Sequence, residues 1–181
     1  MKATGIVRRI DDLGRVVVPK EIRRVMRIRE GDPLEIFTDK EGEIILKKYS
    51  PLGELSTFAQ QYVESMAQIL GCPVCVSDRD QIIAVAGMPK KNLVGKDIHA
   101  DLLDAINDRK SVVAKKHDNK YINITADETE YEGQIVQTII SEGDAIGAVI
   151  VLSKDKKISI GDLEQKVAVI AANFLGRQME G

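Results

Sequence analysis

The sequence changes character at Ser50-Pro51-Leu52-Gly53, where a short arginine-rich segment gives way to a longer acidic one. Residues 1–50, the head, carry a net charge of +3, and the first 29 of them carry +6. Residues 51–181, the body, carry −5, so the overall charge of −2 conceals a strong asymmetry. A break rich in proline and glycine at this point indicates a domain boundary. We predict a domain at 1–50, a linker and helix start at 51–55 and a second domain at 56–181.

Two short hairpins around a short helix are predicted for the head. Its β-branched runs and turn signals predict strands at 4–10, 15–18, 34–38 and 43–48, with a helix at 20–26. Pro19 suits the first position of this helix, because its fixed φ angle is already helical. The side chains expected to face inward from the helix are Ile22, Val25 and Met26.

The head is too small to bury a comfortable core by itself. It has no aromatic residue before Phe37, and it has no cysteine that could form a disulfide bond or a metal site. Its apolar residues therefore need a second copy of the chain as cover. The residues expected at that interface are Ile6, Val7, Ile10, Val16, Val17, Val18, Ile22, Val25, Leu34, Ile36, Ile44 and Leu46. We expect an obligate homodimer of the head.

The arginines of the head favour a polyanion as partner, with a solvated cationic surface as the alternative. Guanidinium groups stay charged and offer a planar fork of donors, which suits phosphate. Successive side chains of a strand face opposite ways, so Arg8 and Arg9 cannot both face one ligand. Residues 1–36 lack the aromatic side chains on which unpaired bases stack, so double-stranded DNA is favoured over single strands.

The segment 2–24, KATGIVRRIDDLGRVVVPKEIRR, closely resembles the AbrB family of bacterial transition-state regulators, and the likeness continues to Tyr49. This resemblance implies a swapped-hairpin fold, in which two chains interlace into one β-rich barrel that binds DNA. The arginines that it implies as DNA contacts are Arg8, Arg15, Arg23 and Arg24. Weaker contributions are expected from Lys2, Arg9, Lys20 and Arg27.

The body is predicted to be an α+β domain, one antiparallel sheet with flanking helices. Apolar residues spaced three and four apart predict helices at 54–70 and 160–178, the second opening at Ser159 with Asp162 as its capping partner. The remaining predicted elements are strands at 73–77, 81–86, 121–124, 134–141 and 145–152 and a helix at 98–107. This order is similar to a member of the AbrB family with a C-terminal GAF-type domain, which implies regulation of sporulation genes and a homotetramer.

The helices at 54–70 and 160–178 have enough apolar bulk to cover a sheet and also to pair with a second copy. The residues expected to pair are Leu55, Phe58, Tyr62, Met66, Val167, Ile170 and Phe174. A plain covering role is the alternative.

Cys72 and Cys75 are the only cysteines, and a place in the core or at a boundary is favoured for them. One C-x-x-C pair cannot supply the four ligands of a structural zinc site. The pair also follows a predicted helix instead of beginning one, so no helix dipole would lower the pKa of its thiols. His99 and His117 belong to no metal-ligand or nucleophile–base spacing and are expected at the surface. We predict no catalytic residue, no metal and no resident cofactor.

These observations favour a cytoplasmic, nucleoid-associated transcription regulator that is not an enzyme. It is expected to bind double-stranded DNA as a homo-oligomer, with no membrane partner, because no apolar run approaches eighteen residues. The GAF-like domain would serve assembly and, as a hypothesis, the sensing of a small-molecule effector. Two alternatives stay open: an antitoxin-like protein-binding module, since related swapped-hairpin heads neutralise toxins, and a GAF-type thiol redox enzyme.

Overall fold

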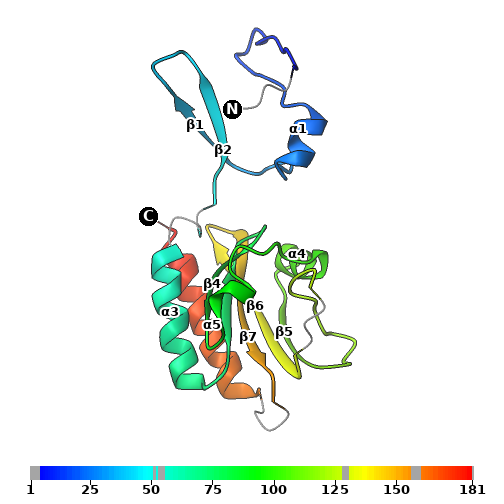
Figure 1. The fold of residues 1–181 in the computed structure, drawn as a ribbon, viewed down its shortest axis with the longest axis vertical. Coiled ribbons are helices and arrows are strands. Elements are labelled where there is room, and N and C mark those ends of the chain that lie inside the picture. The colour runs from blue at the N-terminus through cyan, green and yellow to red at the C-terminus, as the bar shows by residue number, and fades with distance from the viewer. Residues whose placement is uncertain (1–4, 51, 53–55, 128–130, 156–159, 181) are drawn as a thin grey trace. The chain divides into compact units, whose positions relative to one another are not determined.

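A computed structural model of the chain describes residues 5–50, 52, 56–127, 131–155 and 160–180. The chain divides into two compact units, an N-terminal unit at Met1–Tyr49 and a C-terminal unit at Ser50–Gly181 (Figure 1). Helices and antiparallel strands occur in both units, which confirms the predicted α+β class. Among the described helices, none has both the length and the apolarity that a bilayer crossing demands.

The second predicted hairpin of the N-terminal unit is present. Strands β1 (Leu34–Thr38) and β2 (Ile44–Lys48) pair antiparallel, with Leu34 opposite Lys48. Asp39 closes the turn between them, because its Oδ1 accepts hydrogen bonds from the backbone N–H groups of Glu41 at 3.0 Å and Glu43 at 2.8 Å. The tip of this hairpin is thus held by its own aspartate.

The first predicted hairpin does not form in a single chain. Residues 5–19 contain a turn but no strand, so the prediction of strands at 4–10 and 15–18 is wrong for the isolated chain. Three residues predicted to be covered by a second copy are exposed in the single chain: Val7 to 85%, Val17 to 70% and Val25 to 77%. Strands need a neighbour that completes their hydrogen-bond ladder, and none of the described residues forms a strand beside this segment.

Helix α1 (Lys20–Val25) lies close to its predicted range, but two details differ. Pro19 is the N-cap residue rather than the first helical residue, and its carbonyl accepts the backbone N–H of Arg23 at 2.9 Å. None of the residues of α1 is buried, and Met26, which follows the helix, is also exposed. Ile22 and Arg23 are half-buried, so the helix packs only partly against the described residues of its own chain.

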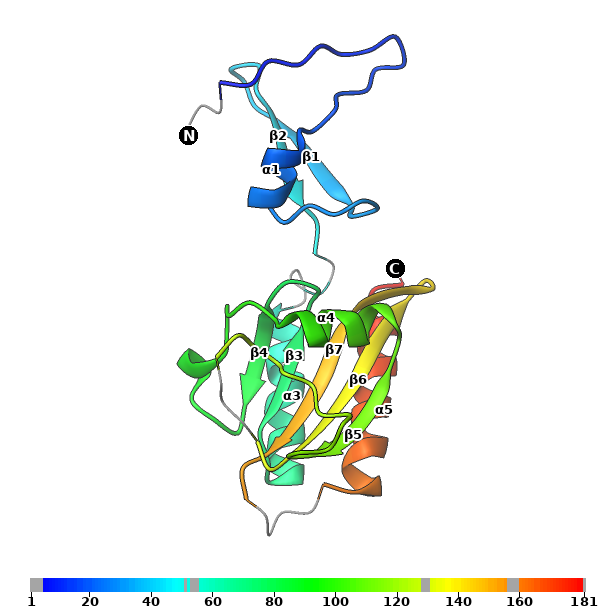
Figure 2. The ribbon, with the colours of Figure 1, turned by 90° about the vertical axis from the view of Figure 1, so that its right-hand side faces the viewer.

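A five-stranded antiparallel sheet in the order β4-β3-β7-β6-β5 forms the centre of the C-terminal unit. Its strands are β3 (Val74–Ser77), β4 (Ile82–Ala86), β5 (Ser111–Lys115), β6 (Gly133–Ser141) and β7 (Asp144–Ser153). Helices α3 (Ser56–Leu70) and α5 (Asp162–Arg177) cover one face, and α4 (Ala100–Asn107) covers the other (Figure 2). A short 3₁₀ helix, η1 (Lys90–Asn92), follows β4. Apolar clusters are buried on both faces.

Two predictions about the strands of this unit are wrong. Residues 121–124 form no strand, although Ile122 and Ile124 are buried and the carbonyl of Ile124 accepts the backbone N–H of His99 at 2.9 Å. Strand β5 was not expected, although Val112 and Ala114 are buried in alternation with exposed neighbours. Apolar alternation marks burial in both segments, but only β5 has a strand beside it to pair with, β6.

The start of the last helix also differs from its prediction. Helix α5 begins at Asp162 with Gly161 as N-cap, and the carboxylate of Glu164 accepts the Gly161 backbone N–H at 2.8 Å. Glu164, rather than Asp162, is therefore the capping partner. Ser159 lies outside the described residues.

Helix α5 and strand β6 approach each other so closely that only glycine fits between them. A β-carbon on Gly176 would overlap the carbonyl oxygen of Ile140. Gly147 of β7 is similarly close to the carbonyl oxygen of Ser77 and to the side chain of Leu52. These two glycines are therefore requirements of packing rather than of backbone angle.

The free edge of the sheet at β4 is covered by a side chain. The Gln60 amide of α3 donates from Nε2 to the Val85 carbonyl at 3.0 Å, and its Oε1 accepts the Val85 backbone N–H at 3.2 Å. The amide thus occupies a donor and an acceptor that a further strand would otherwise pair with.

Candidate nucleic-acid interface

Helix α1 carries two of the four arginines predicted to contact DNA. Arg24 is exposed, whereas Arg23 is half-buried. The Nε of Arg23 is buried and has no hydrogen-bond partner among the described residues. A guanidinium donor without an acceptor is costly unless a partner arrives, and a phosphate oxygen would be a suitable one.

The last turn of α1 ends in a backbone motif that involves Arg27. The Ile28 backbone N–H donates to the Arg23 carbonyl at 2.8 Å, and the Arg27 N–H donates to the Arg24 carbonyl at 3.3 Å. Arg27 itself has a φ of 54°, in the left-handed region. This Schellman arrangement fixes the end of the arginine helix and gives Arg27 a backbone role besides its charge.

The turn at residues 11–15 presents Arg15 to solvent. The Asp11 carboxylate accepts the Arg15 backbone N–H and, on its other oxygen, the Arg15 Nε, both at 2.8 Å. These two bonds, followed by one from the Leu13 N–H, lower the pKa of Asp11 below its ordinary 3.8. Gly14 has a φ of 76°, in the left-handed region that glycine adopts without strain. The Arg15 side chain is still 69% exposed, so it can exchange Asp11 for another anion.

The other predicted contacts lie on the segment without strands, in the first turn of α1 or outside the described residues. Arg8 and Arg9 are exposed on the segment without strand pairing, and the Arg8 Nη1 donates to the neighbouring Val7 carbonyl at 3.2 Å. Lys20 is exposed in the first turn of α1. Lys2 lies outside the described residues.

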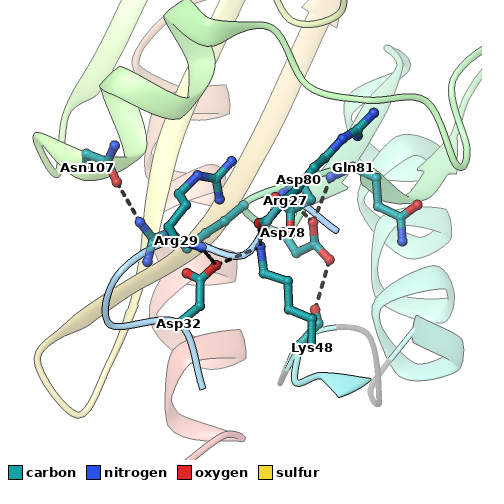
Figure 3. Close-up of polar contacts among 10 residues, drawn as sticks. Arg27, Arg29, Asp32, Lys48, Asp78, Asp80, Gln81 and Asn107 are labelled. Atoms are coloured by element: carbon teal, nitrogen blue, oxygen red, sulfur yellow. Dashed lines mark hydrogen bonds and ion pairs between the residues drawn. The ribbon is translucent and has the colours of Figure 1, made fainter. Parts of the chain in front are cut away.

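The side chain of Asp32, which is buried, supports the end of the arginine helix. The Asp32 Oδ2 accepts the Lys48 Nζ at 2.9 Å and the Arg29 backbone N–H at 2.8 Å, and Lys48 also donates to the Arg27 carbonyl at 2.9 Å (Figure 3). Burial raises the pKa of Asp32, but the Arg29 and Lys48 donors outweigh it and hold the value below 3.8. Lys48 thus links β2 to the end of the arginine helix.

Three aromatic rings gather where α3 and α5 meet. The ring centroids of Tyr62 and Phe174 are 5.3 Å apart, and Phe58 lies 5.8 Å from Phe174 and 6.4 Å from Tyr62. Phe58 and Tyr62 are half-buried, and Phe174 is 37% exposed. The rings cover the sheet and still leave surface facing outward.

The other residues predicted to pair with a second copy differ in how exposed they are. Ile170 is 62% exposed and Val167 is half-buried, both on α5. Met66 is only 5% exposed, inside the core of its own unit, so it cannot contribute to an outer face. Leu55 lies outside the described residues.

Both cysteine thiols are enclosed in the core of the C-terminal unit. Burial, followed by the nearby Glu164 carboxylate, raises the pKa of Cys72 to about 11, and burial raises that of Cys75 to about 12. Thiols with such values are protonated at neutral pH and are poor nucleophiles. This environment suits the core role that was favoured for them.

The histidines and acids offer no enclosed ligand set within the described residues. His99 is half-buried and is the N-cap of α4, where its Nδ1 accepts the Asp101 backbone N–H at 3.1 Å; His117 is exposed. The carboxylates of Asp39, Glu41 and Glu43 approach one another at the β1–β2 turn, where all three are exposed. Exposed acids of this kind are common without a metal ion.

A buried amide in the C-terminal unit lacks any partner within the described residues. Gln134 of β6 is fully buried, and neither its Oε1 nor its Nε2 is hydrogen-bonded. Its cross-strand neighbours, Ala114 and Leu152, belong to the core on the α4 side of the sheet. Buried amides normally find partners, so this one is a candidate contact for a small polar molecule.

Two family models match the chain. The model for the C-terminal domain of stage V sporulation protein T, described as a transcription factor, matches residues 54–180. The model for MazE, a bacterial antitoxin of antidote–toxin recognition, matches residues 7–53.

Three known proteins illustrate the relationships. Stage V sporulation protein T of Bacillus subtilis (strain 168) is 49% identical over 180 residues, 99% of each chain. The transition state regulatory protein AbrB of the same organism is 63% identical over 51 residues, 28% of this chain and 52% of that protein. The solved GAF domain of an Acinetobacter phosphoenolpyruvate-protein phosphotransferase has a TM-score of 0.58 at 12% identity, over 74% of this chain and 84% of that one. At that identity it shows the fold alone, which confirms the GAF-like C-terminal unit.

Proposed function

Because the chain belongs to the stage V sporulation protein T family, we propose that it is a DNA-binding regulator of sporulation transcription. The observation that carries this proposal is the set of arginines held by α1 and by the turn at 11–15, within a chain that aligns with its relative end to end. The proposal places the protein on chromosomal DNA in the cytoplasm.

Two copies of the N-terminal unit would complete one DNA-binding surface. A second copy would cover exposed apolar side chains such as Val7, Val17 and Val25 and would give the segment 5–19, which contains no strand, a neighbouring strand. The same assembly would bring two sets of arginines against one duplex. Each phosphate that they neutralise contributes about −0.9 to the slope of log affinity against log salt.

The C-terminal unit would join such pairs into a larger assembly. The outward surface of the rings of Phe58, Tyr62 and Phe174, together with the exposed Ile170, supports pairing of α3 and α5 with a second copy. Continuous apolar surface on neighbouring helices commonly pairs through two-fold symmetry. A homotetramer is the proposed state.

A small-molecule effector is proposed for the α4 side of the C-terminal unit. The unpaired amide of Gln134 supports this hypothesis, since a bound molecule would satisfy its donor and acceptor. Such a molecule regulates DNA binding only if it favours one arrangement of the assembly over another. Calorimetric titration with candidate metabolites tests this hypothesis. If it detects no binding while DNA binding is intact, assembly would be the only role left for the C-terminal unit.

The rival readings have less support. The antitoxin model covers only residues 7–53, whereas the regulator relative spans both units. The thiol-enzyme reading would need an exposed, readily ionised cysteine, and both cysteines are buried with raised pKa values. We therefore propose that the protein is not an enzyme.

Replacing Arg24 tests the proposed DNA contact. We expect Arg24→Ala to weaken binding of the full chain to duplex DNA about tenfold and to lower the salt slope by about 2 for a dimer, because each copy loses about one phosphate contact. Fluorescence anisotropy over a salt series measures both quantities. Arg177→Ala, at an exposed position in α5, is the matched control. An unchanged slope for Arg24→Ala would contradict the proposed contact.

A further inference from the structure

The two edges of the sheet in the C-terminal unit differ in how open their backbones are. The strand order places β4 at one edge and β5 at the other (Figure 2). At the β4 edge, the Gln60 amide occupies the N–H and C=O of Val85. Strand β5 has β6 on one side and, among the described residues, no strand on the other. The β5 edge is therefore where the sheet can be extended.

The hydrogen bonds at the two ends of β5 show which of its peptide groups face outward. Before the strand, the Thr138 N–H donates to the Lys110 carbonyl at 3.3 Å. After it, the Lys116 N–H donates to the Glu132 carbonyl at 3.1 Å. Hydrogen-bonded positions alternate in an antiparallel pair, so the even-numbered residues between these ends also face β6. The odd-numbered residues, with Val113 in the middle, turn their N–H and C=O groups away from the sheet.

The outward-facing groups of Lys115 are already paired. The Asp118 Oδ2 accepts the Lys115 backbone N–H at 2.8 Å, and the Lys115 carbonyl accepts the Asp118 N–H at 3.0 Å. Val113 differs, because neither its N–H nor its carbonyl is hydrogen-bonded to any described residue. Val113 is also 39% exposed. Its peptide groups are a donor and an acceptor that an added strand would satisfy.

A cavity of about 560 Å³ adjoins this open part of the edge. Val113, Gly133 and Ile160 give it an apolar wall. Side chains of a strand alternate between the faces of a sheet, so Val113 and Lys115 lie on the same face. A strand that pairs with Val113 would place one side chain against the apolar wall and another, two positions along, beside Lys115.

The charged groups that line the cavity leave one cation without a counter-ion. Asp118 is used at the Lys115 backbone, and Lys116, Glu132 and Asp155 each have an interaction of their own. The Lys115 ammonium forms no ion pair with any described residue. A carboxylate on the added strand would pair with it.

A second copy of β5 is a poor occupant of this edge. Residues 108–118 contain four bases and two acids, a net charge of +2, although the body as a whole carries −5. An antiparallel pair centred on Val113 would set Lys110 of each copy opposite Lys116 of the other, and like charges in this position destabilise a pair of strands. The same lysines attract an acidic strand, so the edge favours an acidic segment of another protein.

We propose that the β5 edge binds an extended acidic segment of another protein, which adds a sixth strand to the sheet. In the bound segment, one residue pairs its backbone with Val113 and places an apolar side chain beside Ile160. A carboxylate two positions along pairs with Lys115. In this mode of recognition the main chain gives affinity and alternate side chains give specificity. The proposal goes beyond the proposed function, because it uses the C-terminal unit alone and no contact with DNA.

The probe is a short peptide of serine and threonine that carries one valine and, two positions before it, one glutamate. A second peptide has lysine in place of the glutamate. A third has N-methylvaline in place of the valine and so lacks the N–H that would pair with Val113. Each peptide carries fluorescein and is titrated with the full-length protein in the absence of DNA, with anisotropy as the readout.

We expect the glutamate peptide to bind the wild type with a Kd of about 0.5 mM. The lysine peptide and the N-methyl peptide should each bind about fivefold more weakly. Lys115→Glu should reverse the preference between glutamate and lysine. Lys91→Glu is the matched control, because it makes the same charge change at another exposed lysine of this unit and should keep the wild-type preference.

Hydrogen exchange at single-residue resolution locates the binding. The Val113 amide should exchange about tenfold more slowly when the peptide is present at ten times its Kd. The Ala114 amide faces β6 and should change little. Melting curves show whether both variants are folded, and the three peptides test the wild type whatever the variants do.

Several results would overturn the proposal. They are no binding of the glutamate peptide, equal binding of the lysine or N-methyl peptide by the wild type, and binding that leaves exchange at Val113 unchanged. If Lys115→Glu weakens binding to duplex DNA and leaves peptide binding unchanged, the lysines of this edge serve DNA instead. A wild-type protein that binds the glutamate peptide as expected but no duplex DNA would refute the proposed function and support this proposal.

Discussion

The two units contain the same kinds of apolar residues, but the C-terminal unit buries many of them where the N-terminal unit exposes them. The C-terminal unit buries one apolar cluster on each face of its sheet. The N-terminal unit leaves Ile10, Val17 and Val25 more than half exposed. Isoleucine and valine are seldom exposed in such numbers without a partner surface. The comparison indicates that the C-terminal unit has a core of its own, whereas the N-terminal unit has exposed apolar surface for which we propose a second copy as cover.

The incomplete unit is also the one that carries the arginines. Arg15 and Arg24 are exposed, as are several apolar side chains of the same unit. Assembly and DNA binding are therefore expected to depend on each other, while the C-terminal unit folds independently of both. Three predictions break or sharpen this contrast.

The largest effect is expected from a charge in the uncovered apolar set of the N-terminal unit. Val17→Asp would place a carboxylate where a second copy packs, so the paired unit should not form. We expect duplex affinity to fall about a thousandfold, to the non-specific level, with the melting of the C-terminal unit unchanged. Anisotropy and differential scanning calorimetry measure the two effects.

Val94→Asp is the control, because this valine is 42% exposed in the C-terminal unit and lies outside α3 and α5. It should leave both DNA binding and melting unchanged. A Val17→Asp protein that still binds DNA tightly would show that the N-terminal unit is complete without a partner.

The next largest effect is expected in the C-terminal unit. Gly176→Ala adds a β-carbon that would overlap the Ile140 carbonyl, so α5 must move off β6. We expect the free energy of unfolding of this unit to fall by about 2–3 kcal/mol, as for other overpacked cores. Urea unfolding followed by circular dichroism measures it, and duplex affinity below the transition should persist.

Gly161→Ala provides the matched comparison, because the nearest atom to an added β-carbon there is 3.7 Å away. An equal loss of stability in Gly176→Ala and Gly161→Ala would mean that the close approach of α5 to β6 does not make glycine necessary at position 176.

The smallest effect is a dependence on pH within the N-terminal unit. The pKa of Asp32 is lowered on folding, so its stabilising contribution is complete above 3.8 and is lost as the pH falls through the lower folded value. Asp32→Asn should cost about 1 kcal/mol of unfolding free energy at neutral pH and remove this acid-dependent part.

Denaturant unfolding of the N-terminal unit at pH 7 and at pH 3 measures the dependence. Asp12→Asn, at an exposed position of the same unit, is the control. The role of Asp32 would be refuted by a wild-type protein and an Asp32→Asn protein that lose equal stability on acidification.

The local sequence predicted most of the C-terminal fold because each element there carries its own signal. The spacing of apolar residues located α3 and α5 to within a few residues. It failed at residues 121–124, where buried isoleucines occur without a neighbouring strand, and at β5, whose pairing with β6 is a property of the fold. Pairing across a sheet is not encoded in any one segment.

The candidate site was predictable only in part, for a related reason. The family resemblance named Arg15 and Arg24, and the structure shows both exposed. Nothing local to Asp32 or Asp78 indicated that Lys48 and Ser50 would bond to them, because each pair is separated by at least sixteen residues of chain. Supporting contacts of this kind appear only once the chain has folded.

The amide of Gln60, seated on the Val85 backbone, has a consequence for crowded conditions. A protein that associates through exposed apolar surface can also polymerise through backbone N–H and C=O groups that lack a partner at a sheet edge. By occupying the N–H and C=O of Val85, Gln60 hinders another strand from pairing with β4. If copies gather on DNA as we propose, Gln60 thus disfavours one route by which they could grow into fibres.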